Sequence, residues 1–183
     1  MRSQKLNLYN KKKNRISIII AKLIWDFFGK TLFASNFPGT YWRKFILRIF
    51  GGKIGKGGKL KINIKISEPW NLSIGDHCWI GENVWIDNLA LVRIGNRVCI
   101  SQGVYLCTGN HNYKKDLFNL ILEKIVIEDD CWIAAKSVIA PGSILKRGSV
   151  TFLGSIVSGI LQQDGIYKGN PAKLVKSKDD NLN

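Results

Sequence analysis

The chain has 183 residues, of which 45% are hydrophobic, and its 28 lysines and arginines outnumber its 13 acidic residues to give a formal net charge of +15. This length suits a single globular domain, and the apolar content excludes a disordered chain. The positive charge leaves three classes of partner open: nucleic acid, an anionic membrane surface and a phosphate-bearing ligand.

Residues 1–52 form a basic segment in which we predict two short helices. The first covers residues 16–28, which are largely apolar but contain Lys22 and Asp26. A membrane-spanning helix needs about 20 apolar residues, so this run is too short to cross a bilayer. A helix here would align five apolar side chains on one stripe: Ile16, Ile19, Ile20, Leu23 and Phe27. No small-residue cleavage site follows the run, so we expect no signal peptide.

The second predicted helix covers residues 41–50 and is both basic and amphipathic. Three cations, Arg43, Lys44 and Arg48, alternate with apolar residues, and the helix should end at Gly51. Its apolar members are Trp42, Phe45, Ile46, Ile49 and Phe50. For both helices we expect packing against the domain, at the end of its stack of coils, with docking on a membrane surface as the alternative.

From residue 54 onward the apolar period changes to six. The repeated positions are Ile54, Leu60, Ile66, Ile74, Ile80, Ile86, Ile94, Ile100, Leu106, Ile127, Ile133, Ile139, Leu145, Thr151 and Val157. Because strand side chains alternate, the residue two before the next repeat should also point inward. That second set is small or β-branched: Cys78, Val84, Ala90, Val98, Val104, Cys131, Ser137, Ser143, Ser149 and Ser155. The pattern predicts a three-sided β-helix built from hexapeptides.

The repeats sort into threes, and every long step falls between one triplet and the next. The longest step runs from Leu106 to Ile127 and creates a loop over residues 107–126 that contains His111. Because all extra residues share one corner, Asp87 and Asn88 should lie one coil below the root of this loop, at a strand spacing of about 4.8 Å. Either side chain could orient His111 or bind an acceptor hydroxyl; an Asx turn is the alternative.

The four cysteines contain no C-x-x-C pair and no zinc-ligand spacing, so we expect no metal site. Cys78 and Cys131 occupy inward positions, and we predict buried thiols in a reducing cytoplasm.

The other histidine, His77, should be a solvated corner residue. Three tryptophans precede inward positions and should point outward, with Tyr105 one coil above Trp85; outward aromatics of this kind favour a subunit interface. These tryptophans are Trp79, Trp85 and Trp132.

Three further motifs accompany the repeat: TGNHNY at residues 108–113, CWIAAKSVIAPGS at residues 131–143 and YKGNPAKLVK at residues 167–176. Together they resemble the hexapeptide-repeat O-acetyltransferases, and especially the colanic acid biosynthesis acetyltransferases, over residues 37–176. The resemblance implies an all-β fold, a left-handed parallel β-helix with a short helical N-terminal segment. It also implies a homotrimer with active sites between neighbouring subunits. The β-helix domain would cover residues 53–162, followed by a cofactor-contacting tail over residues 163–183.

The resemblance also implies roles for individual residues. His111 would act as general base on an acceptor hydroxyl, which then attacks the thioester of acetyl-CoA. Asp87, Asn88 and Asn110 are the candidates for substrate binding. The candidates for contacts to acetyl-CoA are Trp132, Ala135, Leu153, Ser158 and Lys173.

The sequence therefore predicts a cytoplasmic enzyme that transfers acetyl from acetyl-CoA to a sugar hydroxyl of a surface polysaccharide or its precursor. Transfer to another small acceptor such as serine is one alternative, although serine acetyltransferases carry a longer helical front. A non-catalytic β-helix scaffold is another, and the loop histidine argues against it. Nucleic-acid binding is disfavoured, because the basic residues cluster at the chain ends and no recognition motif is present. Peripheral contact with the inner membrane surface through residues 1–52 stays open.

Overall fold

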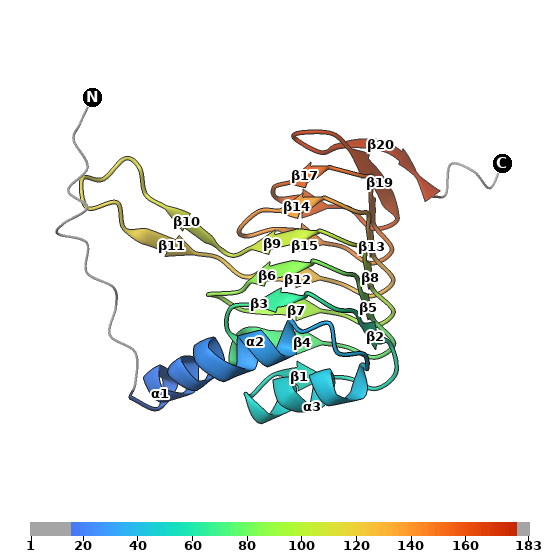
Figure 1. The fold of residues 1–183 in the computed structure, drawn as a ribbon. Coiled ribbons are helices and arrows are strands. Elements are labelled where there is room, and N and C mark those ends of the chain that lie inside the picture. The colour runs from blue at the N-terminus through green and yellow to red at the C-terminus, as the bar shows by residue number, and fades with distance from the viewer. Residues whose placement is uncertain (1–15, 179–183) are drawn as a thin grey trace.

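A computed structural model describes residues 16–178, and its body is a left-handed parallel β-helix of six coils (Figure 1). Face A consists of β1 (Lys53–Ile54), β4 (Leu72–Ile74), β7 (Val92–Ile94), β12 (Ile125–Ile127), β15 (Ile144–Leu145) and β18 (Ile160–Leu161). Face B consists of β2 (Lys59–Leu60), β5 (Trp79–Ile80), β8 (Cys99–Ile100), β13 (Trp132–Ile133), β16 (Val150–Thr151) and β19 (Gly165–Lys168). Face C consists of β3 (Lys65–Ile66), β6 (Trp85–Asp87), β9 (Tyr105–Cys107), β14 (Val138–Ile139) and β17 (Ile156–Val157). The last strand, β20 (Lys173–Ser177), pairs antiparallel with β19.

The period-six prediction of the core is confirmed. All fifteen repeated positions, from Ile54 to Val157, are buried. The second inward set is buried too, except that Ala90 is half-buried at a corner. Both Cys78 and Cys131 are buried free thiols, and His77 is exposed at a corner with φ of 58°. Two inward columns per face fill the narrow interior and leave little space beyond the side chains themselves.

Close coil stacking explains the glycines that follow inward residues at the corner between faces A and B. A Cβ placed on Gly75 would lie 2.6 Å from the carbonyl oxygen of Gly95, one coil above. No side chain fits at that approach, so glycine is required there.

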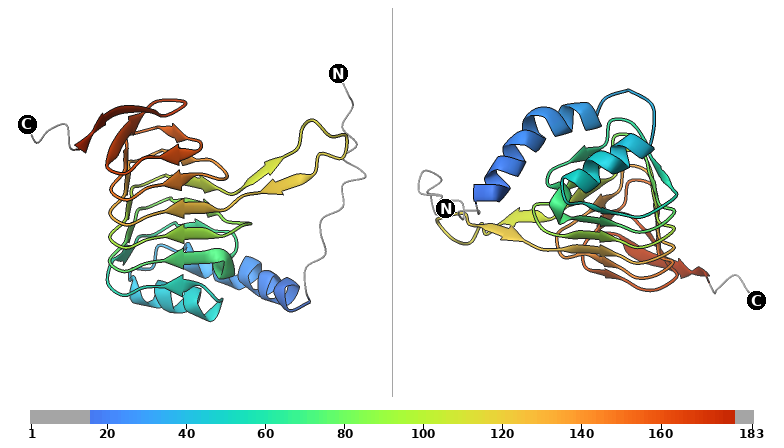
Figure 2. Two further views of the ribbon diagram at one scale, coloured as in Figure 1. Left: turned by 180° about the vertical axis from the view of Figure 1, so that it is seen from behind. Right: turned by 90° about the horizontal axis from the view of Figure 1, so that it is seen from below.

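The extra residues do share one corner, between faces C and A. The step between β3 and β4 holds the 3-10 helix η3 (Pro69–Asn71). The step between β9 and β12 holds an antiparallel hairpin, β10 (Gly109–His111) with β11 (Leu120–Leu122), which projects from the coil (Figures 1 and 2). Sorting the repeats into threes therefore located the hairpin correctly.

Helices lie across the open end of the first coil (Figure 2). The first helical run is α1 (Ile16–Ile24), a π-helical turn η2 (Trp25–Gly29) and α2 (Lys30–Phe33), and the second is α3 (Tyr41–Ile49). Trp25 and Phe33 face the coil and are fully buried, and the indole N–H of Trp25 donates to the carbonyl oxygen of Ile66 at 2.9 Å. Within residues 16–178, no helix is both long and apolar enough to cross a membrane.

Both helices pack on the end of the coil, as expected, and Ile46 and Phe50 of the predicted apolar set contact the core. Several other apolar residues of the two helices face outward instead. The stripe from Ile16 to Phe27 lies exposed on α1, with Phe27 76% exposed. On α3, Phe45 and Ile49 are each 63% exposed, whereas Arg43 is buried. The cause is the open edge of the first coil, where backbone carbonyls need donors. Lys44 donates from its ammonium to the carbonyl oxygens of Gly55 and Gly57, and Arg48 donates from Nη2 to that of Ile54 at 2.6 Å. Lys44 and Arg48 therefore turn toward the coil, and Phe45 and Ile49 face outward.

Candidate active site

His111 lies at the end of β10, on the hairpin that projects from the corner between faces C and A. It pairs with Leu120 across the hairpin, and the backbone N–H of Asn112 donates to the carbonyl oxygen of Asn119 at 2.8 Å. Antiparallel pairing turns an insertion into an ordered arm, because each strand provides partners for the other. The arm holds His111 away from the body of its own coil.

The imidazole of His111 is oriented by Phe118, a residue that sequence reasoning did not identify. Its Nδ1 lies 2.7 Å from the carbonyl oxygen of Phe118. A carbonyl oxygen only accepts hydrogen bonds, so Nδ1 carries a proton, and in the neutral imidazole Nε2 is then the nitrogen that can accept one. The two rings also stack, with centroids 4.3 Å apart and planes 7° from parallel. This contact forms only after the hairpin closes, and no local sequence signal indicates it.

Asn110 has a local role beside the histidine. Its Oδ1 accepts the backbone N–H of His111 at 2.8 Å, and the residue is otherwise exposed. The amide therefore supports the backbone at His111 and still faces solvent on the arm.

Asp87 lies one coil below the root of the hairpin, as the triplet pattern predicted. It pairs with Cys107, and Thr108 donates to its carbonyl oxygen from both the backbone N–H, at 3.1 Å, and Oγ1, at 2.8 Å. Its half-buried carboxylate accepts Ser67 Oγ at 2.8 Å and the Tyr105 hydroxyl at 3.3 Å. Burial raises the pKa of Tyr105, with further increases from Cys107 and Asp87, so the phenol stays a donor toward Asp87.

Asn88 lies at the same corner but is buried within the coil. Its Nδ2 donates to the carbonyl oxygen of Glu68 at 2.6 Å, and its Oδ1 accepts the backbone N–H of Glu68 at 3.0 Å. The side chain is 0% exposed. Its amide therefore joins two coils, and a substrate on the surface does not reach it.

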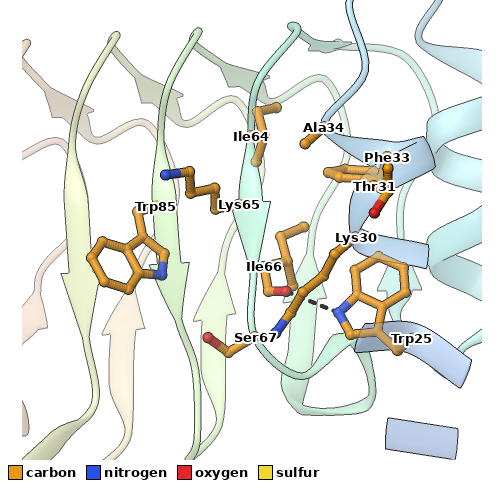
Figure 3. A pocket seen from close by; sticks show the side chains of 10 residues that line it. All are labelled: Trp25, Lys30, Thr31, Phe33, Ala34, Ile64, Lys65, Ile66, Ser67 and Trp85. Atoms are coloured by element: carbon orange, nitrogen blue, oxygen red, sulfur yellow. Dashed lines mark hydrogen bonds between the residues drawn. The ribbon is translucent and has the colours of Figure 1, made fainter. Parts of the chain in front are cut away.

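A cavity of about 370 Å³ opens on face C next to α2 (Figure 3). Its polar lining includes Lys30, Lys65 and Ser67, and its aromatic lining includes Trp25 and Trp85. Sequence reasoning missed this site because one wall comes from the N-terminal helix. The register offered a partial signal: Lys65 pairs with Trp85, and both occupy outward positions before an inward residue.

The cavity is connected to Asp87 by an aromatic pair. Trp85 pairs with Tyr105 on the coil above, and the rings stack with centroids 4.6 Å apart, as predicted. Tyr105 in turn donates to Asp87. Cavity, aromatic pair and carboxylate are therefore neighbours on face C, with Asp87 at the end of β6 that lies toward the hairpin corner.

The candidates for acetyl-CoA contacts fall into two places. Trp132 is half exposed on face B, where its indole N–H donates to Ser101 Oγ at 3.0 Å. Ala135 and Leu153 occupy the corner between faces B and C on successive coils, where the N–H of Gly154 donates to the carbonyl oxygen of Ala135 at 2.9 Å. Lys173 begins β20 and pairs with Lys168 at the far end of face B.

Ser158 lies apart from this group, exposed just after β17. This is the corner between faces C and A, the same corner that carries the hairpin. The structure thus brings together Trp132, Ala135, Leu153 and Lys173 along face B and its edge, and places Ser158 across face C.

Comparison with known proteins identifies relatives of this fold and chain. No family model matches the sequence. The chain is 36% identical over 156 residues to the Escherichia coli (strain K12) protein named "Putative colanic acid biosynthesis acetyltransferase WcaF", covering 85% of this chain and 86% of WcaF. The hexapeptide-repeat acetyltransferase VCA0836 from Vibrio cholerae superimposes with a TM-score of 0.80 at 25% identity, covering 89% of this chain and 93% of VCA0836.

Two complexes extend the structural comparison. VCA0836 with acetyl coenzyme A superimposes with a TM-score of 0.82 at 24% identity, covering 94% of each chain. A galactoside acetyltransferase in complex with coenzyme A superimposes with a TM-score of 0.79 at 21% identity, covering 92% of this chain and 86% of that one. The fold is shared throughout, and the WcaF match extends over most of both sequences. The chain belongs to the hexapeptide-repeat acetyltransferases.

Proposed function

We propose that the protein transfers acetyl from acetyl-CoA to a sugar hydroxyl of a surface polysaccharide or its precursor, with His111 as the general base. The contact between His111 Nδ1 and the Phe118 carbonyl oxygen carries this proposal, because it leaves Nε2 as the basic nitrogen. The name of WcaF supports a polysaccharide acceptor, and the VCA0836 complex supports acetyl-CoA as donor.

The reaction is direct transfer between two bound substrates. Nε2 of His111 takes the proton from the acceptor hydroxyl, whose oxygen attacks the carbonyl carbon of the thioester. The C–S bond then breaks, and the departing sulfur takes the proton from the imidazolium, which returns His111 to its starting state. Products are the O-acetyl sugar and free coenzyme A.

The donor fits along face B and its edge with face C. Leu153 and Trp132 offer exposed apolar surface for the pantetheine arm. Lys173 and Lys168 pair at the end of face B and would provide positive charge for the nucleotide phosphates.

The acceptor fits along face C, between the cavity and the hairpin. The Trp85–Tyr105 pair offers an aromatic surface for a sugar ring, and the Asp87 carboxylate accepts hydroxyl hydrogen bonds. Lys65, exposed at the cavity, suits an anionic group on the same acceptor.

A homotrimer would complete the site. The hairpin carries His111 away from its own coil, so a neighbouring subunit is needed to provide the other wall (Figure 1). Trp79, Trp85 and Trp132 stay half exposed in one protomer, as interface aromatics do.

The free thiols of Cys99 and Cys107 suit a reducing compartment such as the cytoplasm.

Matched histidine variants of the full chain test the proposal. Release of free coenzyme A thiol and acetylation of oligosaccharide acceptors are measured for wild type, His111→Asn and His77→Asn. We expect His111→Asn to lower kcat/KM by about 10²–10⁴-fold, because general-base catalysis contributes that much. His77→Asn should match wild type, since His77 is an exposed corner residue whose left-handed backbone suits asparagine. Equal rates for the two variants would sink the general-base role.

A further inference from the structure

The excess charge of the chain lies entirely within the first 66 residues of its sequence. Residues 1–66 contain 16 lysines and arginines and one acidic residue, whereas residues 67–183 contain 12 of each. The first group corresponds to the N-terminal segment and the first coil, and the second to all later coils and the tail. The formal charge of +15 therefore comes from the first third of the sequence, and 10 of these 16 cations lie in the described residues 16–66.

Five lysines form a belt around the first coil: Lys53, Lys56, Lys59, Lys61 and Lys65. Lys53, Lys59 and Lys65 point outward from faces A, B and C, and all five are exposed. No acidic residue lies in residues 53–66. We call this set the lysine belt, and it surrounds the coil on every side.

Beyond the belt, the molecule ends in an exposed apolar surface made by α1 and α3. It includes Ile16, Ile20, Leu23 and Phe27 of α1, and Tyr41, Phe45 and Ile49 of α3. An open groove of about 430 Å³ joins the two helices and is itself apolar, with Ile18, Ile24, Ile49 and Trp70 among its lining residues. Soluble proteins rarely expose so many large apolar side chains together without a partner. We call this surface the apolar end.

The outward direction of the apolar end is fixed by buried hydrogen bonds. Arg43 is 1% exposed and donates to the carbonyl oxygens of Phe33, Ser35, Phe37 and Gly39. Lys44 and Arg48 satisfy the carbonyls at the open edge of the first coil. Turning α3 over to hide Phe45 would remove these partners from the buried Arg43 and Lys44, which is strongly unfavourable. The exposed apolar side is therefore a stable feature of the fold.

We propose that this end of the β-helix docks on an anionic lipid bilayer, with the apolar end in the headgroup region and the lysine belt against the lipid phosphates. An apolar helix surface bordered by lysines matches the interfacial layer of a membrane in both polarity and charge. A second copy of the chain is a poor occupant, because it would bring two strongly positive ends together. Nucleic acid would match the lysines but would leave the apolar side chains in water. This docking does not depend on the acetyl-transfer chemistry, although Lys65 of the belt also lines the proposed acceptor surface.

Sedimentation with lipid vesicles tests the proposal on the full chain. Binding is measured to vesicles of phosphatidylcholine alone and of phosphatidylcholine mixed with phosphatidylglycerol. We expect binding to the anionic vesicles only, and a decline as salt rises, since exposed charges are screened. Binding to neither vesicle, or equal binding to both, would overturn the proposal. Tight binding to duplex DNA without vesicle binding would replace it with a nucleic-acid surface.

Charge-matched variants locate the contact. Lys53→Glu with Lys61→Glu changes the belt, and Lys176→Glu with Lys178→Glu makes the same charge change at the opposite end. We expect the first pair to weaken binding to anionic vesicles at least about tenfold and the second to change it less than about twofold.

A third variant, Phe27→Ser with Phe45→Ser, should weaken binding while leaving the net charge unchanged. Equal losses in the two lysine pairs would show that attraction is diffuse and would refute docking through this end. Unchanged circular dichroism and an unchanged thermal unfolding transition would show that each variant is folded.

Discussion

The Asp87 carboxylate lies between two hydroxyl donors on the surface that leads to His111. Ser67 and Tyr105 each donate to one of its oxygens, so the carboxylate is held in one orientation. A fixed carboxylate with remaining lone pairs accepts a sugar hydroxyl at little further entropic cost. Its place beneath the hairpin root, where Thr108 donates twice to its carbonyl oxygen, fixes its height relative to the histidine arm.

Replacing Asp87 by Asn tests this role. The amide oxygen still accepts one hydroxyl, but the charge is lost, and hydrogen bonds to charged groups contribute about 1.5–3 kcal/mol. We therefore expect kcat/KM for the sugar acceptor to fall by about 10- to 100-fold, with the KM for acetyl-CoA unchanged. Asp76→Asn, the same change at the corner between faces A and B, is the control and should keep wild-type kinetics. If Asp87→Asn also kept them, Asp87 would be only a structural corner residue.

The cation-bearing helix α3 shows how an element can be predicted while its orientation is not. Its alternation of cations and apolar residues correctly indicated a helix over residues 41–50. The helix packs on the end of the coil as expected, but Phe45 and Ile49 face outward because Lys44 and Arg48 donate to the carbonyls of the first coil. Those acceptors belong to residues 54–57, and only the tertiary arrangement brings them under the helix. Local periodicity contains no information about a neighbour of this kind.

Arg43 holds the connection between α2 and α3, and its removal should destabilise the N-terminal end. Arg43→Met keeps the volume of the stem but leaves four carbonyl oxygens without their donor. Each buried polar group without a partner costs about 1–3 kcal/mol, and we expect a loss of about 2–4 kcal/mol after local relaxation. Urea unfolding followed by tryptophan fluorescence measures this. Arg93→Met, on an exposed arginine of β7, should stay within about 0.5 kcal/mol of wild type, and an equal effect of the two variants would contradict the role of Arg43.

Over the whole molecule, the sequence predicts those features that repeat and misses those that occur once. The core columns and the corner that holds His111 follow from a period of six, which every coil must obey to stack on the next. The contact between His111 and Phe118, the cavity beside α2 and the apolar end each depend on a single tertiary approach. A unique contact leaves no periodic trace in the sequence, so periodicity could not reveal it.

Charged side chains also connect the coils along the corner between faces A and B. Asp130, on the fourth coil, accepts Arg97 Nε of the coil below at 2.6 Å and Arg147 Nε of the coil above at 3.1 Å. Glu128 pairs with Lys146 at 2.9 Å. In a solenoid each coil contacts only its neighbours, so coil-to-coil pairs contribute directly to cooperativity.

Acid should therefore weaken the stack through these carboxylates. Hydrogen bonding to Arg97 lowers the pKa of Asp130, and hydrogen bonding to Lys146 lowers that of Glu128. A folded-state pKa below the unfolded value means that the stabilisation is present above about pH 5 and is lost as pH falls through about 4 and below. The Asp130→Asn side chain is neutral at every pH, so this variant lacks the ion pairs that wild type has at pH 7. We therefore expect its melting temperature to lie below that of wild type at pH 7. The difference should disappear toward pH 3, where Asp130 of wild type becomes protonated. Because the pairs are exposed, high salt at pH 7 should reduce the same difference. A difference that stayed constant from pH 7 to pH 3 would show that the Asp130 ion pairs do not couple the coils.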